Sequence, residues 1–72
     1  MATARVLSEV TGSVWKIEVA IGQAVAEGET VMVVESMKME IPVTAPCAGV
    51  VKEILIQEGE AVTEDQCLAI LG

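Results

Sequence analysis

The clearest pattern in the chain is a series of short apolar runs in which hydrophobic and polar residues tend to alternate. These runs are rich in Val and Ile, which favour β-strands. Strands are predicted at about 4–8, 13–19, 30–35, 39–44, 50–57 and 67–71, with stubs at 24–25 and 61–62. No stretch shows the 3.6-residue period of a helix, so the sequence predicts an all-β fold.

The pattern repeats itself with an offset of 37 residues. In one ungapped register, the half-repeats at about 4–36 and 39–72 share eight identical residues, glycines included. Two copies are too few for a solenoid, which needs about three or more repeats. The repeat instead predicts a single closed domain over 1–72, in which each half covers the apolar face of the other about a pseudo-two-fold axis.

The alternation is interrupted at one equivalent place in each half. Val14 and Ile17 are three residues apart, where two or four would keep them on one face of a strand. Val51 and Ile54 repeat this spacing in the second half. One extra residue in a strand is the signature of a β-bulge, so we expect a bulge in both halves.

A second repeated feature is the stretch Gly22-x-x-Val25-x-x-Gly28, which recurs from Gly59 with Asp65 as its last residue. Asp tolerates a positive φ better than most residues that carry a side chain, so the replacement fits a turn. A phosphate-binding loop would need a following Gly-Lys-Ser/Thr or a helix N-terminus, and the sequence contains neither. These glycines are therefore predicted to form turns between strands.

Composition limits the core that the chain can build. Of the 72 residues, 53% are hydrophobic, and Trp15 is the only aromatic one, so the core must consist of aliphatic side chains and Met. Cys47 and Cys67 stand alone, without a histidine to complete a metal site. We expect no metal and two small, buried thiols in a reducing cytoplasm.

Charge and motif content exclude several function classes. The net charge of −7, with only four Lys and Arg, argues against a nucleic-acid partner. No apolar run approaches the roughly 18 residues of a membrane span, so we expect no membrane insertion. The first residues lack a signal peptide's apolar region, which predicts a cytoplasmic location. Without a nucleophile–base pair or a histidine, we expect no catalytic residues and no enzyme activity.

The junction between the half-repeats carries the most unusual residues, Glu35-Ser36-Met37-Lys38-Met39-Glu40. The predicted strands on either side are so close that the chain must reverse direction here. Two-residue hairpin turns usually contain Asn-Gly or a similar pair, because both residues need positive φ. Met-Lys is a poor turn by this standard, and exposed methionines are costly. A local rule broken in an otherwise consistent chain points to a functional site, so Lys38 is the candidate.

These features resemble the biotinyl/lipoyl attachment domain family, and most of all its small free-standing attachment proteins and biotin carboxyl carrier domains. The resemblance covers about 5–71 and rests chiefly on the six residues around Lys38, with support from the turn glycines and Ala45-Pro46. It implies a flattened β-barrel (a barrel-sandwich hybrid) of two antiparallel four-stranded sheets. The modified lysine would lie on an exposed hairpin, at the end of the molecule opposite the two chain termini.

The resemblance also implies a function for the hairpin. A biotin protein ligase would attach biotin to Lys38 through an amide, recognising Met37 and Met39, with Glu35 and Glu40 as secondary contacts. The attached biotin would carry carboxylate, as carboxybiotin, between a biotin carboxylase and a carboxyltransferase of an acyl-CoA or related carboxylase. The chain would then be a non-catalytic carrier.

The sequence departs from the commonest family pattern at two places. Ser36 stands where Ala is usual, and we expect this change to have little effect on modification. The first half also has no room for the protruding insertion of some carrier domains.

A lipoyl carrier domain is the nearest alternative. Lipoyl domains typically have Asp before the lysine and a small residue after it, whereas Lys38 has Met on both sides, which favours biotin over lipoate. A dual biotin/lipoate acceptor stays open, because some single-domain relatives are suspected of taking either cofactor. The unmodified lipoyl-like modules of membrane-fusion adaptors fit less well, because they normally sit between long helical hairpins.

Overall fold

The computed structural model describes residues 3–72, and every regular element in this range is a strand. Within this range, no helix is long and apolar enough to cross a membrane. The strands are β1 (Ala4–Leu7), β2 (Gly12–Ile17), β3 (Ala24–Val25), β4 (Thr30–Ser36), β5 (Met39–Thr44), β6 (Gly49–Ile54), β7 (Ala61–Val62) and β8 (Cys67–Leu71).

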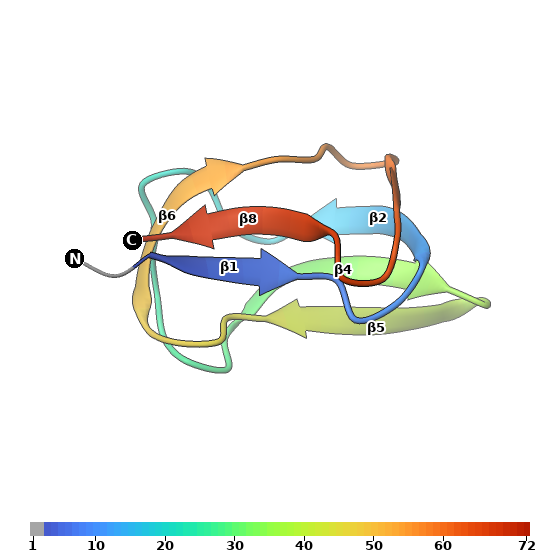
Figure 1. Ribbon diagram of the computed structural model, residues 1–72. Coiled ribbons are helices and arrows are strands. Elements are labelled where there is room, and N and C mark those ends of the chain that lie inside the picture. The colour runs from blue at the N-terminus through green and yellow to red at the C-terminus, as the bar shows by residue number, and fades with distance from the viewer. Residues whose placement is uncertain (1–2) are drawn as a thin grey trace.

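The strands form two antiparallel four-stranded sheets that face each other (Figure 1). The first, here called the terminal sheet, has the order β1-β8-β6-β3, and the second, the hairpin sheet, has the order β5-β4-β2-β7. Each strand of one sheet lies 37 residues from the strand in the same place of the other. The predicted fold, a flattened β-barrel (a barrel-sandwich hybrid) of two antiparallel four-stranded sheets with pseudo-two-fold symmetry, is confirmed.

The hydrophobic core lies between the sheets and follows the same symmetry. Within the described range, each buried hydrophobic residue has a buried counterpart 37 positions away, and the one buried polar residue is Ser8, the counterpart of Ala45. The Ser8 hydroxyl donates a hydrogen bond of 2.6 Å to the Val10 carbonyl, so its burial leaves no polar atom unsatisfied. The core residues are Val6, Val14, Val19, Val25, Val31, Met32, Val34, Val43, Ala45, Val51, Ile56, Val62, Leu68, Ala69 and Leu71.

Both predicted bulges are present. The pairing of β2 with β4 shifts between Val14 and Lys16, and the pairing of β6 with β8 shifts between Val51 and Glu53. In each half the extra residue lets the strand bend while its apolar side chains stay on the core face.

The predicted turns are confirmed as well. Gly22, Gly28 and Gly59 have φ values of 92°, 83° and 88°, and Asp65 takes the equivalent place with a φ of 69°. These values lie in the left-handed region that glycine enters without steric cost. The backbone N–H of Gly28 donates to Ala45 O at 2.9 Å, and that of Asp65 donates to Ser8 O at 2.7 Å, so the two turns are anchored in the same way.

Two strands end earlier than the sequence predicts. β2 ends at Ile17 and β6 at Ile54, whereas the apolar pattern continues to Val19 and Ile56. Both later residues are buried, yet the chain leaves the ladder there to cross to the opposite sheet. These buried apolar residues therefore make each strand appear longer in the sequence than it is in the structure.

The prediction for the cysteines was wrong for Cys47, which is exposed in the connection between β5 and β6. Residue type favours burial of a free cysteine, but the position of this one in a surface loop decides its exposure. Cys67, at the start of β8, is partly buried.

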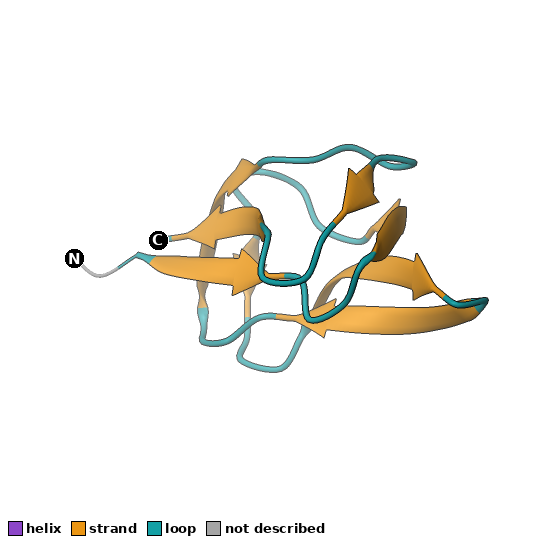
Figure 2. Ribbon diagram, turned by 45° about the vertical axis from the view of Figure 1, so that its right-hand side comes forward, coloured by secondary structure: helices purple, strands orange, loops and turns teal. Residues whose placement is uncertain are grey.

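The β4–β5 hairpin projects from one end of the molecule, as Figure 2 shows. β1 starts and β8 finishes at the other end, where Ala4 pairs with Leu71 (Figure 1). The hairpin is thus unobstructed by the two ends of the described chain, as predicted.

Candidate functional site

The hairpin turn consists of Met37 and Lys38, closed by the pair Ser36 and Met39. Met37 has a φ of 52° and Lys38 a φ of 65°, so both residues are left-handed, as a type I′ turn requires. For residues with a Cβ this conformation costs roughly 1–2 kcal/mol each. The pairing of β4 with β5 holds the turn despite this cost. Met-Lys is thus a poor fit to the turn that it forms, as predicted.

The side chains of the turn are open to solvent. Met37 is 93% exposed, Met39 is 64% exposed, and Lys38 is exposed between them. Among residues 3–72 the one salt bridge joins Lys16 Nζ to Glu18 Oε1 at 3.5 Å, so the Lys38 ammonium is engaged by no carboxylate of this range. Another protein can therefore reach the amine without displacing any neighbour.

Two acidic residues flank the turn as a direct cross-strand pair. Glu35 on β4 lies opposite Glu40 on β5, and both are exposed on the outer face of the hairpin sheet. Like charges directly opposite each other destabilise a sheet. The pair therefore weakens the hairpin unless a cationic group of another molecule lies against it.

The root of the hairpin is fixed by contacts that the sequence did not reveal. The Ser36 hydroxyl donates a hydrogen bond of 2.8 Å to the carbonyl oxygen of Thr11, just before β2. The next residue, Gly12, lies so close to β4 that a Cβ there would overlap the carbonyl oxygen of Glu35. The signals in the sequence were Ser36 in place of Ala and the identity of Gly12 with Gly49, but spacing alone does not say what they contact.

The structure thus gathers all the predicted site residues in one hairpin: Glu35, Met37, Lys38, Met39 and Glu40. The methionines and the lysine form the tip, and the two glutamates lie one pair further from it. Their roles in attachment and recognition stay predictions.

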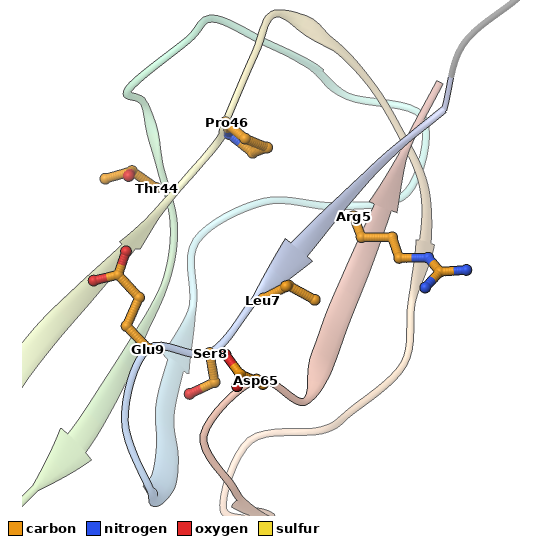
Figure 3. Close-up of a pocket in the computed structure, with 7 residues that line it drawn as sticks. All are labelled: Arg5, Leu7, Ser8, Glu9, Thr44, Pro46 and Asp65. Atoms are coloured by element: carbon orange, nitrogen blue, oxygen red, sulfur yellow. The ribbon is translucent and has the colours of Figure 1, made fainter.

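A cavity of about 320 Å³ lies apart from the hairpin tip, between the edge strands β1 and β5 (Figure 3). Its charged side chains do not converge, because the Arg5 guanidinium and the Glu9 carboxylate extend in different directions. Its lining residues are Arg5, Leu7, Ser8, Glu9, Thr44, Pro46 and Asp65. No group of three or more His, Cys, Asp or Glu in the described part of the chain is placed to hold a metal ion.

Comparison with known proteins gives the family. The family described as biotin-requiring enzyme matches residues 3–71. The chain is 42% identical over 64 residues to the biotin/lipoyl attachment protein of Bacillus subtilis, covering 89% of this chain and 88% of that protein. It is also 42% identical over 64 residues to the alpha3 subunit of a biotin-dependent acyl-coenzyme A carboxylase of Mycobacterium leprae, covering 89% of this chain but 11% of the subunit.

A lipoyl-type relative and a solved structure complete the comparison. A probable dihydrolipoyllysine-residue succinyltransferase of Schizosaccharomyces pombe is 46% identical over 50 residues, which is 69% of this chain and 11% of that protein. The crystal structure of Kluyveromyces lactis urea carboxylase superimposes with a TM-score of 0.94 at 33% identity over 100% of this chain, which spans 6% of that enzyme. With the exposed lysine hairpin and the two-fold half-barrel, these matches establish that the chain belongs to the biotinyl/lipoyl attachment domain family.

Proposed function

We propose that this chain is a biotin carboxyl carrier and that Lys38 is the residue to which biotin is attached. The observation that carries the proposal is the tip of the β4–β5 hairpin, where an exposed lysine stands in an unfavourable backbone conformation between two exposed methionines. Stability alone would favour Asn-Gly at this turn. The family match and the carboxylase relatives support the same assignment.

The geometry of the hairpin suits covalent attachment. An amide forms between the carboxyl carbon of biotin and Lys38 Nζ, with overall loss of water, and the ligase supplies the activation of the carboxyl group. The amine must lose its proton before it attacks, and the hairpin offers no base for this, so the proton passes to the ligase or to solvent. Since Lys38 lies in the turn of a projecting hairpin, the ligase can enclose the amine without unfolding the domain.

The role of the protein part is then to carry and present the arm. Biotin, once attached, supplies the group that accepts and releases carboxylate, and the enzymes that act on it are a biotin carboxylase and a carboxyltransferase of an acyl-CoA or related carboxylase. Tethering keeps the cofactor at roughly millimolar effective concentration near both sites. The rigid two-sheet core keeps the arm away from the domain surface, so that it reaches either enzyme.

Lipoate is the second candidate for the same lysine. The lipoyl-type relative and the name of the Bacillus subtilis protein support lipoate, or the use of both cofactors, as an alternative. The methionines on both sides of Lys38 favour biotin.

The decisive experiment is intact-mass measurement after co-expression with a biotin protein ligase. We expect the wild-type chain to gain one biotin less water, Lys38→Arg to gain nothing, and both to show the same urea midpoint, because residue 38 is exposed. Lys52→Arg is the matched control and should load like wild type, because Lys52 is exposed on β6, outside the hairpin. Biotin on the Lys38→Arg chain would contradict the site assignment.

A further inference from the structure

The outer face of the hairpin sheet carries an exposed apolar surface next to the acidic pair. Trp15 is the extra residue of the β2 bulge and is 52% exposed. In this register Lys16, the next residue, pairs with Val33 of β4, which pairs in turn with Pro42 of β5. Glu35 and Glu40 follow on the same face, two residues nearer the tip. We call Trp15, Val33, Pro42, Glu35 and Glu40 the Trp15 face.

The pseudo-two-fold counterpart of the Trp15 face has a different character. Lys52 occupies the place of Trp15 in the terminal sheet, and Gly72 occupies the place of Glu35. The core obeys the symmetry, whereas the outer surface breaks it with the only aromatic residue of the chain and a pair of like charges. Neither belongs to the core, because Trp15 is 52% exposed and both glutamates are exposed. This difference points to a partner at the hairpin end.

Interface size shows why the hairpin tip alone is too small for a specific contact. Even a weak interface buries on the order of 600 Å² per partner, and the whole domain exposes 4445 Å². An enzyme that reacts with the lysine amine must also come within roughly 6 Å of its backbone, the length of an extended lysine side chain. That enzyme must therefore cover a flank of the hairpin as well as its tip.

We propose that the Trp15 face is the docking surface for the enzyme that modifies Lys38, which places cationic side chains against Glu35 and Glu40 and an apolar recess around Trp15. This inference rests on the proposed function. An exposed tryptophan beside a charged rim has the composition of an interface hot spot. The distance from the closing pair of the turn to the row of Val33 is about 10 Å, so one flank contact reaches both groups.

The modifying enzyme and the later partners meet side chains of different length at residue 38. After loading, the lysine side chain is extended by the full length of the cofactor, so a carboxylase component can act on its far end without touching the sheet. The modifying enzyme has only the short lysine stem. The Trp15 face therefore fits the enzyme that meets the unloaded chain.

The test is steady-state loading of the unloaded chain by a biotin protein ligase with biotin and ATP. We expect Trp15→Ala to raise KM for the chain about 10-fold with kcat unchanged, because a hot-spot tryptophan contributes to docking and not to amide formation. Lys52→Ala, the change at the pseudo-symmetric position, should leave KM unchanged. We also expect KM of the wild type to rise with salt, and this dependence to weaken in the Glu35→Gln, Glu40→Gln double variant.

The outcomes separate this inference from the proposed function. A wild-type chain that takes no biotin overturns the proposed function, and the docking inference with it. A loaded wild type with equal KM values for Trp15→Ala and Lys52→Ala overturns the docking inference alone. A second copy of the chain as the true occupant would appear as a wild-type dimer in analytical ultracentrifugation that Trp15→Ala dissociates, and this result also overturns it. Urea midpoints of both variants equal to that of the wild type confirm that neither change acts through unfolding.

Discussion

At Met37 and Lys38 the chain uses side chains that are poorly suited to the backbone they occupy. Both residues have positive φ, and the first is almost fully exposed despite its apolar side chain. Asn and Gly enter this conformation with less strain, and a polar residue would be easier to hydrate. This poor fit is what our proposal explains, since the turn residues would then be those that a modifying enzyme recognises.

Replacing the methionines tests this explanation. In Met37→Asp with Met39→Ala, the lysine keeps its turn, but its neighbours become those typical of lipoyl domains. We expect loading by biotin ligase to fall at least 10-fold and loading by lipoyl ligase to rise, measured by intact mass with each ligase in turn. Unchanged biotin loading of the double variant would show that the methionines do not determine specificity.

Ser36 holds the root of the hairpin through its hydroxyl. Ser36→Ala removes the 2.8 Å bond to the Thr11 carbonyl, and we expect a loss of about 0.5–1.5 kcal/mol in the free energy of unfolding. Amide hydrogens of β4 and β5 near the turn should exchange faster, while those of β8 should not change. Ser13→Ala, on the neighbouring strand β2, is the control in the same urea titrations. Equal exchange in both variants would remove the role assigned to this hydroxyl.

At the scale of the element, the hairpin depends on a close approach between β4 and the start of β2. Ser13 pairs with Glu35, and Gly12 lies beside Glu35 and Ser36, just before the turn. The absence of a side chain at Gly12 lets the two backbones meet. The acidic pair and the strained turn weaken the hairpin, and this contact supports it from below.

The repeat supplies a matched pair of variants for that contact. A Cβ at Gly12 would overlap the carbonyl oxygen of Glu35, whereas a Cβ at Gly49 would lie 3.3 Å from the carbonyl oxygen of Gly72, at the other end of the molecule. We expect Gly12→Ala to cost about 2–3 kcal/mol in urea unfolding and Gly49→Ala less than about 1 kcal/mol. Only Gly12→Ala should slow biotin loading of the folded chain. Equal costs would mean that β4 shifts to accept the methyl group without strain.

Much of this fold could be predicted from the sequence, because the repeat shows each structural feature twice. The bulge at Val14 and the turn at Asp65 were predicted from spacing, since each has an equivalent in the other half. The ends of β2 and β6 were not, because a residue that crosses between sheets is buried like a strand residue. The exposure of Trp15 and Cys47 could not be predicted from residue type either. Trp15 is exposed because of its position in the bulge, and Cys47 because it lies in a loop.

For the molecule as a whole, the two halves contribute equivalent surfaces to one core, so neither half has a core of its own. Small domains of this kind have free energies of unfolding of about 4–11 kcal/mol, by a per-residue estimate. A single buried methyl group is then a measurable fraction of the total. The symmetry is least perfect at the equivalent positions Met32 and Ala69, whose side chains differ greatly in size although both are fully buried.

The pseudo-two-fold core makes a quantitative prediction for equivalent valines. Val14 and Val51 are each 1% exposed, and each precedes the bulge of its strand. Val14→Ala and Val51→Ala remove the same two methyl groups from matching surroundings, so we expect each to cost about 2 kcal/mol. Urea unfolding followed by far-ultraviolet circular dichroism measures both, and the values should agree within about 0.5 kcal/mol. A difference of more than about 1 kcal/mol would mean that the halves share a backbone pattern without sharing packing, and that the symmetry of the core does not extend to its energetics.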